Sequence, residues 1–219
     1  MLLRLLTKRR FSGASGQLVT ILRRADYEKQ LWKNGLGYTH EIAICKSKSK
    51  DAPFTWRLSM ADLTPVQDGP FSQMCQVDRT ILLLRGDCSI EVNGAPAVAL
   101  QPFQPFSFPG DVPTVSTVLH NGRDLNCMVD RNNCSSAVHV IAAGERPVPM
   151  QLKQGDILFV TALGGPSAFA LGKCSREESF VLDKEDTLRY DITSPGGKTH
   201  LTVSAGRVVA FIISRLNNV

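Results

Sequence analysis

The stretch Ile81–Leu100, ILLLRGDCSIEVNGAPAVAL, consists of short apolar or alternating runs separated by turn signals. Asn93-Gly94 suits the positive φ angles of a type I′ turn, so it predicts a hairpin between the runs Cys88–Val92 and Ala97–Leu100. Gly86-Asp87 marks another turn, directly after an apolar run. Short strands joined by tight turns indicate antiparallel β-structure.

The same punctuation continues beyond this stretch, with turn signals about every eight to twelve residues. Further strands are predicted at Tyr38–Cys45, Phe54–Leu63, Val115–Leu119, Leu125–Val129, Ala137–Ala142, Ile157–Leu163, Ala168–Leu171, Phe180–Leu182, Leu188–Ile192, His200–Ser204 and Val208–Ser214. A short helix is expected around Cys174–Glu178. This spacing favours an all-β sandwich or barrel over an alternating α/β fold.

The composition is that of a globular protein, with 219 residues, 43% hydrophobic and 21% charged. The longest uncharged run, Val92–Gly110, contains four prolines, which exclude a membrane-spanning helix because they would interrupt its backbone hydrogen bonds. The six cysteines show no C-x-x-C spacing, so they predict neither a zinc site nor a disulfide framework. We expect a soluble protein that does not associate with membranes.

The positive net charge of the chain comes from its first residues. Six basic side chains lie within residues 1–24, without an acidic one, and subtracting them from the net charge of +5 leaves −1 for residues 25–219. A nearly neutral body does not predict nucleic-acid binding. Residues 1–16 resemble an organellar transit peptide, and Arg4 interrupts the apolar run that a secretory signal needs. We therefore expect a basic leader over residues 1–24 and a mitochondrial or cytoplasmic protein, not a secreted one.

A turn-rich segment near Gly144–Pro147 divides the remaining chain into two β-rich parts. We predict a first β-barrel over residues 25–145 and a second β-rich half over residues 146–219. The pattern alone leaves open whether these parts are two barrels or one large sandwich.

Alternation along Phe54–Leu63 separates an apolar face from a face on which Thr55 and Ser59 flank Arg57. The same rule places Thr39 with Glu41, and Asp124 with Asn126, on shared faces of two other strands. These polar faces either line a barrel interior, where Arg57 can grip a carboxylate with two parallel hydrogen bonds, or face water. Spacing alone favours water, because one side of an antiparallel sheet is commonly solvated.

Several motifs follow one another between about residues 31 and 131. They are WKNGLGYTHEI at 32–42, FTWRLSMA at 54–61, DGPFS at 68–72, DRT at 78–80, FPGD at 108–111 and LNCM at 125–128. In this order they resemble the HutD/Ves family of cupin-fold proteins. Two positions depart from the family pattern: Leu36 replaces a glycine, and His40 stands where arginine is frequent.

The resemblance implies an all-β bicupin, with two small β-barrels in one chain, and a binding site for a small acidic metabolite. The ligand-binding residues that it implies are Asn34, Thr39, Glu41, Arg57, Ser59, Phe71, Arg79 and Asn126. Arg57 would grip the ligand carboxylate with help from Ser59 and Thr39, and Arg79 would be a second cation. Asn126 would orient a carbonyl or amide, Glu41 would hold an arginine or accept an N–H, and Phe71 would close the rim. Asp78 and Asp124 are interpreted as partners of neighbouring arginines.

The four histidines, at positions 40, 120, 139 and 200, contain no H-x-H pattern, so we predict no metal site and no cofactor. Three function classes stay open. The first is a sensor or regulator that binds a formyl- or formimino-amino acid from histidine breakdown. The second is a metal-free hydrolase or isomerase acting on an acidic amide, with Glu41 as general base. The third is an interaction module without a ligand, and a homodimer is compatible with each of them.

Overall fold

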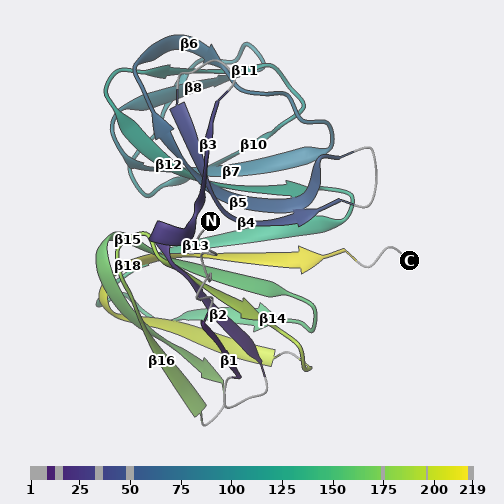
Figure 1. Cartoon of the computed structure of the whole chain (residues 1–219), viewed down its shortest axis with the longest axis vertical. Coiled ribbons are helices and arrows are strands. Elements are labelled where there is room, and N and C mark those ends of the chain that lie inside the picture. The colour runs from purple at the N-terminus through teal and green to yellow at the C-terminus, as the bar shows by residue number, and fades with distance from the viewer. Residues whose placement is uncertain are drawn as a thin grey trace, which may run out of the picture. The chain divides into compact units, whose positions relative to one another are not determined.

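The computed structural model describes residues 9–12, 17–32, 37–47, 52–173, 176–195 and 197–216 (Figure 1). The described elements are β-strands apart from one short 3-10 helix, η1 (Arg24–Asp26). No helix in the described ranges is long and apolar enough to cross a membrane. The chain forms two compact units, which we call the central unit (residues 28–136 and 215–219) and the split unit (residues 1–27 and 137–214).

The central unit contains two antiparallel sheets. Its strands are β3 (Glu28–Leu31), β4 (Gly37–Lys46), β5 (Phe54–Leu63), β6 (Val66–Pro70), β7 (Val77–Arg85), β8 (Cys88–Val92), β9 (Val98–Ala99), β10 (Pro105–Pro109), β11 (Thr114–Val118) and β12 (Gly122–Asp130). One sheet has the order β10-β7-β12-β5-β4-β3 and the other the order β6-β11-β8-β9. Leu63 and Ile81 from the first sheet belong to one buried apolar cluster with Ile90 and Val118 from the second, which joins the two sheets.

The split unit is built on one large sheet, with the order β1-β2-β17-β15-β18-β13. Its strands are β1 (Arg9–Ser12), β2 (Leu18–Leu22), β13 (Cys134–Ala142), β14 (Val148–Leu152), β15 (Ile157–Lys173), β16 (Arg176–Leu182), β17 (Thr187–Asp191) and β18 (Gly197–Arg215). β14 pairs with β18, and β16 pairs with β15. The interior of this unit is occupied by packed aliphatic and aromatic side chains, among them Leu158, Phe169 and Leu201.

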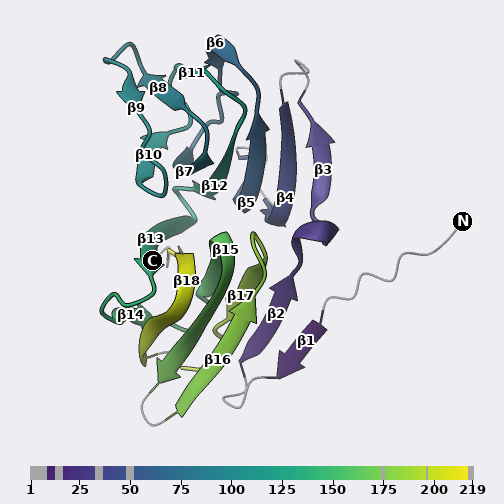
Figure 2. The same ribbon diagram turned by 90° about the vertical axis from the view of Figure 1, so that its left-hand side faces the viewer.

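The structure corrects the predicted boundaries. Leu18–Leu22, assigned to a basic leader, is β2, which pairs with β17 along its whole length (Figure 2). Val19 and Leu22 are buried there, and Val19 packs with Ile21 in the apolar core of the split unit, which the charge pattern did not reveal. The second boundary lies between Ser136 and Ala137, inside β13, and not after residue 145.

Local turn chemistry predicted the β8–β9 hairpin correctly. Asn93 and Gly94 have φ angles of 53° and 73°, and β8 pairs with β9 across them. The expected helix around Cys174–Glu178 is wrong: Arg176–Leu182 is a strand paired with β15, and residues 174–175 lie outside the described ranges. The predicted strands Ile157–Leu163 and Ala168–Leu171 are parts of one continuous strand, β15. Likewise, His200–Ser204 and Val208–Ser214 are parts of β18.

Glycine explains these two continuous strands. The pairing of β15 with β18 shifts register between Leu163 and Ala168, so the glycine-rich segment bends the strand without ending it. Gly206 on the partner strand has a φ of 74°, and a Cβ there would lie 2.5 Å from the carbonyl oxygen of Pro166. Only glycine fits this close approach.

Candidate functional site

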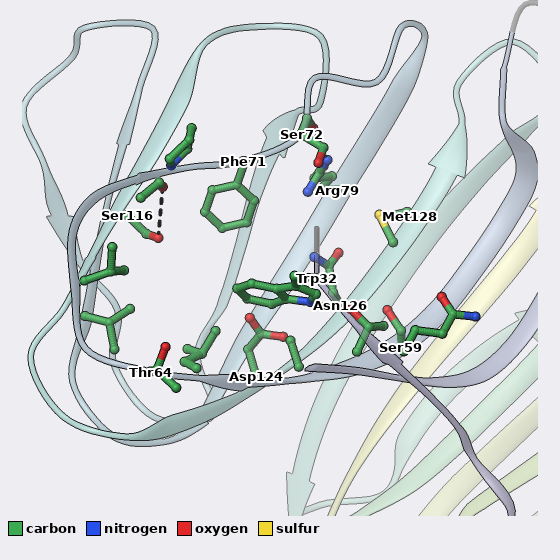
Figure 3. A pocket seen from close by; sticks show the side chains of 18 of the residues that line it. Trp32, Ser59, Thr64, Phe71, Ser72, Arg79, Ser116, Asp124, Asn126 and Met128 are labelled. Atoms are coloured by element: carbon green, nitrogen blue, oxygen red, sulfur yellow. Dashed lines mark hydrogen bonds between the residues drawn. The ribbon is translucent and has the colours of Figure 1, made fainter. Parts of the chain in front are cut away.

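A cavity of about 600 Å³ opens between the two sheets of the central unit (Figure 3). Its walls combine polar and apolar side chains from strands of both sheets. They are Gln30, Leu31, Trp32, Thr39, Arg57, Ser59, Ala61, Leu63, Thr64, Val66, Gly69, Pro70, Phe71, Ser72, Met74, Arg79, Ser116, Val118, Asp124, Asn126 and Met128. The polar face of Phe54–Leu63 therefore lines a cavity, and the water-facing alternative is wrong for Arg57 and Ser59.

Strand register explains why residues far apart in the sequence meet on this wall. Met128 on β12 pairs with Arg57 on β5 and with Arg79 on β7. Two residues earlier on β12, Asn126 pairs with Ser59. Directly opposed residues of antiparallel strands point to the same face, so the pairs form successive rows across the sheet. The next row is formed by Asp124, Ala61 and Thr39.

Arg79 is the most deeply buried cation of the cavity, with 5% of the residue exposed. Its Nη2 donates to the carbonyl oxygen of Ser72, and its guanidinium lies 5.4 Å from the ring centroid of Phe71. Its Nε has no hydrogen-bond partner, and no carboxylate of the described chain forms an ion pair with it. Burial lowers the pKa of Arg79 to about 10, while Asp124 opposes this shift. Arg79 is thus protonated at neutral pH and forms no ion pair with any carboxylate that the structure describes.

The loop beside Arg79 depends on a glycine. A Cβ on Gly110 would lie 2.9 Å from the carbonyl oxygen of Val77 and 3.1 Å from Nε of Arg79. The N–H of Gly110 also donates to the carbonyl oxygen of Val77, and its carbonyl oxygen accepts from the N–H of Met74. The glycine of the FPGD motif therefore lets this loop approach the buried guanidinium.

The aspartates of the DRT and FPGD motifs bind one arginine outside the cavity. Arg131 lies 2.8 Å from a carboxylate oxygen of Asp78 and 2.7 Å from one of Asp111. Its Nη2 also donates to the carbonyl oxygen of Val77. The interpretation of Asp78 as the partner of an arginine agrees with this contact, which fixes the loop that carries Gly110.

Arg57 reaches the cavity, but a carboxylate of the same chain already accompanies it. Its Nε lies 3.0 Å from Oε2 of Glu41 in an ion pair, although the N–H does not have hydrogen-bond geometry. Its Nη2 donates to Oε1 of Gln30 at 3.4 Å. Glu41 therefore holds an arginine, which was one of its two predicted roles. Arg79, predicted as the second cation, is the arginine of the cavity that forms no ion pair with the described chain.

Asp124 is the functional candidate that sequence reasoning misread as a simple partner of an arginine. It is 3% exposed, its Oδ1 has no hydrogen-bond partner, and no described arginine forms an ion pair with it. Burial raises the pKa of Asp124 to about 7, against smaller opposing effects of an Ala61 backbone bond and Arg79. Asn126, two residues further on the same face, also has an unpartnered Oδ1. The alternation that places Asp124 and Asn126 on one face of the strand was the sequence signal that could have identified Asp124 as a cavity residue.

Aromatic side chains frame the polar groups. Nε1 of Trp32 donates to Oγ1 of Thr39 at 2.8 Å, and both residues line the cavity. Phe71 lines it as well and packs edge-on against Phe108, with ring centroids 5.6 Å apart. Trp32 belongs to the first motif but was absent from the predicted site. Asn34, a predicted ligand-binding residue, lies outside the described residues. So does Leu36, the residue that replaces a glycine of the family pattern.

Histidines do not contribute to the cavity wall. His40 pairs with Asp62 at 2.7 Å, and His120 pairs with Asp87 at 2.9 Å. Within the described ranges, no group of three or more His, Cys, Asp or Glu side chains is placed to hold a metal ion.

Comparisons with known proteins agree with this architecture. The HutD family model matches residues 24–211. The chain is 37% identical to Protein Ves of Cronobacter sakazakii over 134 residues, which cover 59% of this chain and 69% of that protein. It is 40% identical over 109 residues to an uncharacterized 21.2 kDa protein in the hutC 3′ region of Pseudomonas putida, covering 48% and 55% of the two chains.

Solved structures show the same fold. HutD from Pseudomonas fluorescens SBW25 superposes with a TM-score of 0.73 at 22% identity, over 91% of this chain and all of that chain. A conserved protein of unknown function from Pseudomonas aeruginosa PAO1 gives a TM-score of 0.74 at 27% identity, with the same coverage. Bacillus subtilis oxalate decarboxylase, at 8% identity, gives 0.57 over 88% of this chain and 76% of that chain, which shows the fold alone. The chain has an all-β cupin fold and belongs to the HutD family.

Proposed function

We propose that this protein binds a small carboxylate-bearing metabolite in the cavity of the central unit and acts as a sensor or regulator. Arg79 is the principal contact for the carboxylate, and Arg57 is the second cation. The ligand is of the formyl- or formimino-amino acid type. The resemblance to the HutD/Ves family suggests this class, and the position of the Pseudomonas putida relative in the hutC 3′ region supports it.

The observation that carries the proposal is the uncompensated charge of Arg79. A buried cation without a counterion is costly, and an anionic ligand that reaches it removes this cost. The unpartnered Nε leaves a guanidinium N–H to donate to a carboxylate oxygen. Phe71 and Phe108 lie against the same guanidinium and shield it from water, which strengthens its attraction for an anion.

The cavity has the size expected of a metabolite site. Its volume of about 600 Å³ lies within the range of roughly 300–1,000 Å³ that is typical of small-molecule pockets. Polar side chains of β5, β7 and β12 line part of the cavity, whereas Leu63 on β5, Val66 on β6 and Val118 on β11 provide apolar surface. Such a lining fits a short ligand with a polar group at each end and a few methylenes between them.

Thermal unfolding with a panel of N-formyl and N-formimino amino acids tests the proposal, because a bound ligand stabilises the native state by mass action. Chromatography of the same samples measures whether the compound is consumed. We expect stabilisation without consumption, and no stabilisation of Arg79→Met. Arg85→Met, on the same strand but exposed, is the matched control and should respond like the wild type. A response that persists in Arg79→Met contradicts the proposal, and no response to any compound favours an interaction module.

One observation favours the enzymatic alternative, a metal-free hydrolase or isomerase. A carboxyl group with a pKa of about 7 is suited to general acid–base catalysis, and Asp124 is such a group. Glu41, the base predicted from the sequence, is held by Arg57. Consumption of a compound that is lost in Asp124→Asn but kept in Glu41→Gln would establish this alternative with Asp124 as the base.

A further inference from the structure

The cavity contains unpartnered acceptors as well as a cation that forms no ion pair with the described chain. Oδ1 of Asp124 and Oδ1 of Asn126 are both buried and without a hydrogen-bond partner. The two residues alternate with Leu125 on β12, so both side chains lie on the cavity side of the sheet (Figure 3). Buried acceptors are normally satisfied, so this pair requires donors that the described part of the chain does not supply.

Charged groups face Asp124 from each neighbouring element. Arg79 on β7 and Arg123 on β12 favour its ionised form, whereas Asp62 on β5 disfavours it. Arg123 and His40 already bind the carboxylate of Asp62. These charges leave Asp124 without a bonded counterion.

The remaining groups near Asp124 add no free charge. Cys88 on β8 is a neutral thiol, because burial raises its pKa to about 12. Two rows further along the same sheet, Arg57 and Glu41 form their own ion pair. The cavity is left with one cation, Arg79, and one carboxyl group, Asp124, which no ion pair joins.

A cation and a carboxyl group in one cavity, which interact electrostatically but are not joined in an ion pair, match a ligand with opposite charges at its two ends. The carboxylate of such a ligand reaches Arg79, while a protonated nitrogen donates to Asp124. A neutral amide N–H would satisfy the hydrogen bond but would not offset the buried negative charge. Hydrogen bonds with a charged partner are about twice as strong as neutral ones.

We propose that Asp124 is a specificity-determining residue, which selects ligands that bring a protonated amidine or amine N–H group in addition to a carboxylate. This inference rests on the proposed function and narrows it: formimino compounds, whose amidine is protonated at neutral pH, bind more tightly than formyl compounds, whose amide is neutral. Asn126 accepts a second N–H from the same group.

The pH dependence follows from the protonation state of Asp124. The cationic group needs an ionised carboxylate, and the pKa of Asp124 in the empty cavity is about 7. Affinity for the formimino compound should therefore rise with pH and level off near pH 8. Because only about 3% of Asp124 is ionised at pH 5.5, affinity at that pH should be about 30-fold lower than at pH 8.

Isothermal titration calorimetry with N-formimino-glycine and N-formyl-glycine tests this inference. The two compounds share their carboxylate and differ only in the group that would meet Asp124. At pH 8 we expect the formimino compound to bind at least about tenfold more tightly to the wild type. At pH 5.5 the two affinities should be similar. The preference should disappear in Asp124→Asn and persist in Asp87→Asn, an exposed aspartate paired with His120.

The outcomes separate this inference from the function on which it rests. Binding of both compounds without a preference at pH 8, or a preference that survives in Asp124→Asn, overturns the role of Asp124 and leaves the carboxylate site intact. If neither compound, nor the same derivatives of glutamate, binds the wild type at any pH, the proposed function fails and this inference fails with it. Thermal unfolding of each variant without ligand shows that it is folded.

Discussion

Replacing Asp124 by Asn should stabilise the empty protein, and the gain should grow with pH. The pKa of Asp124 is raised by burial to about 7 in the folded protein, whereas an aspartate in an unfolded chain has a pKa of about 3.9. Between these values the folded state binds more protons than the unfolded state, so wild-type stability falls as pH rises. Asparagine has a similar shape and does not titrate.

The magnitude follows from the difference between the two pKa values of Asp124. Each unit is worth about 1.4 kcal/mol, so the full effect above pH 7 is about 4 kcal/mol. At pH 5 only about 1.5 kcal/mol of this has developed. The difference in the free energy of unfolding between Asp124→Asn and the wild type should therefore increase by about 3 kcal/mol from pH 5 to pH 8.

Urea denaturation at pH 5, 6, 7 and 8, without ligand and at constant ionic strength, measures this difference directly. Asp87→Asn is the control, because that aspartate is exposed and its substitution removes the same charge from the same unit. A difference between Asp124→Asn and wild type that stays constant over this range would refute the reasoning. It would mean that the Asp124 carboxyl is solvated or paired in the native state.

Two further substitutions test the frame of the cavity. Gly110→Ala places a Cβ 2.9 Å from the carbonyl oxygen of Val77; it should lower the free energy of unfolding by about 1–3 kcal/mol and reduce the ligand-induced thermal shift. Thr39→Val removes the acceptor of the Trp32 Nε1–H and should cost about 1 kcal/mol; tryptophan fluorescence and urea denaturation would show it, and unchanged values in both would contradict this role.

Local patterns predicted the elements that depend on neighbouring residues. Turn residues such as Asn93-Gly94 determine their own φ angles, and alternation along Phe54–Leu63 determines which side chains share a face. The sequence did not tell whether that face meets water or a cavity. The second sheet decides this, because Val118 and its neighbours on β11 cover the wall that carries Arg57. Contacts between distant strands leave no local periodic signal.

Charge pairing within the cavity depends on register in the same way. Glu41 pairs across the sheet with Ser59, and a register shift between Glu41 and Ala43 follows immediately. This irregularity accompanies the approach of Glu41 to Arg57, and no motif in the sequence indicates a bulge at that position. Both arginines that the family motifs singled out line the cavity, but the motifs could not show which one the chain itself neutralises.

The pairing of Arg57 with Glu41 changes what the remaining groups can do. A cavity with two free arginines would accept any small dianion and would discriminate only by size. With Arg57 neutralised, Arg79 and Asp124 are left as opposite charges on neighbouring strands, and neither has a bonded counterion in the described chain. Keeping both groups buried and apart is costly to the empty protein, and a dipolar ligand offsets both costs at once. Selectivity for such a ligand and the destabilisation by Asp124 therefore share one physical cause.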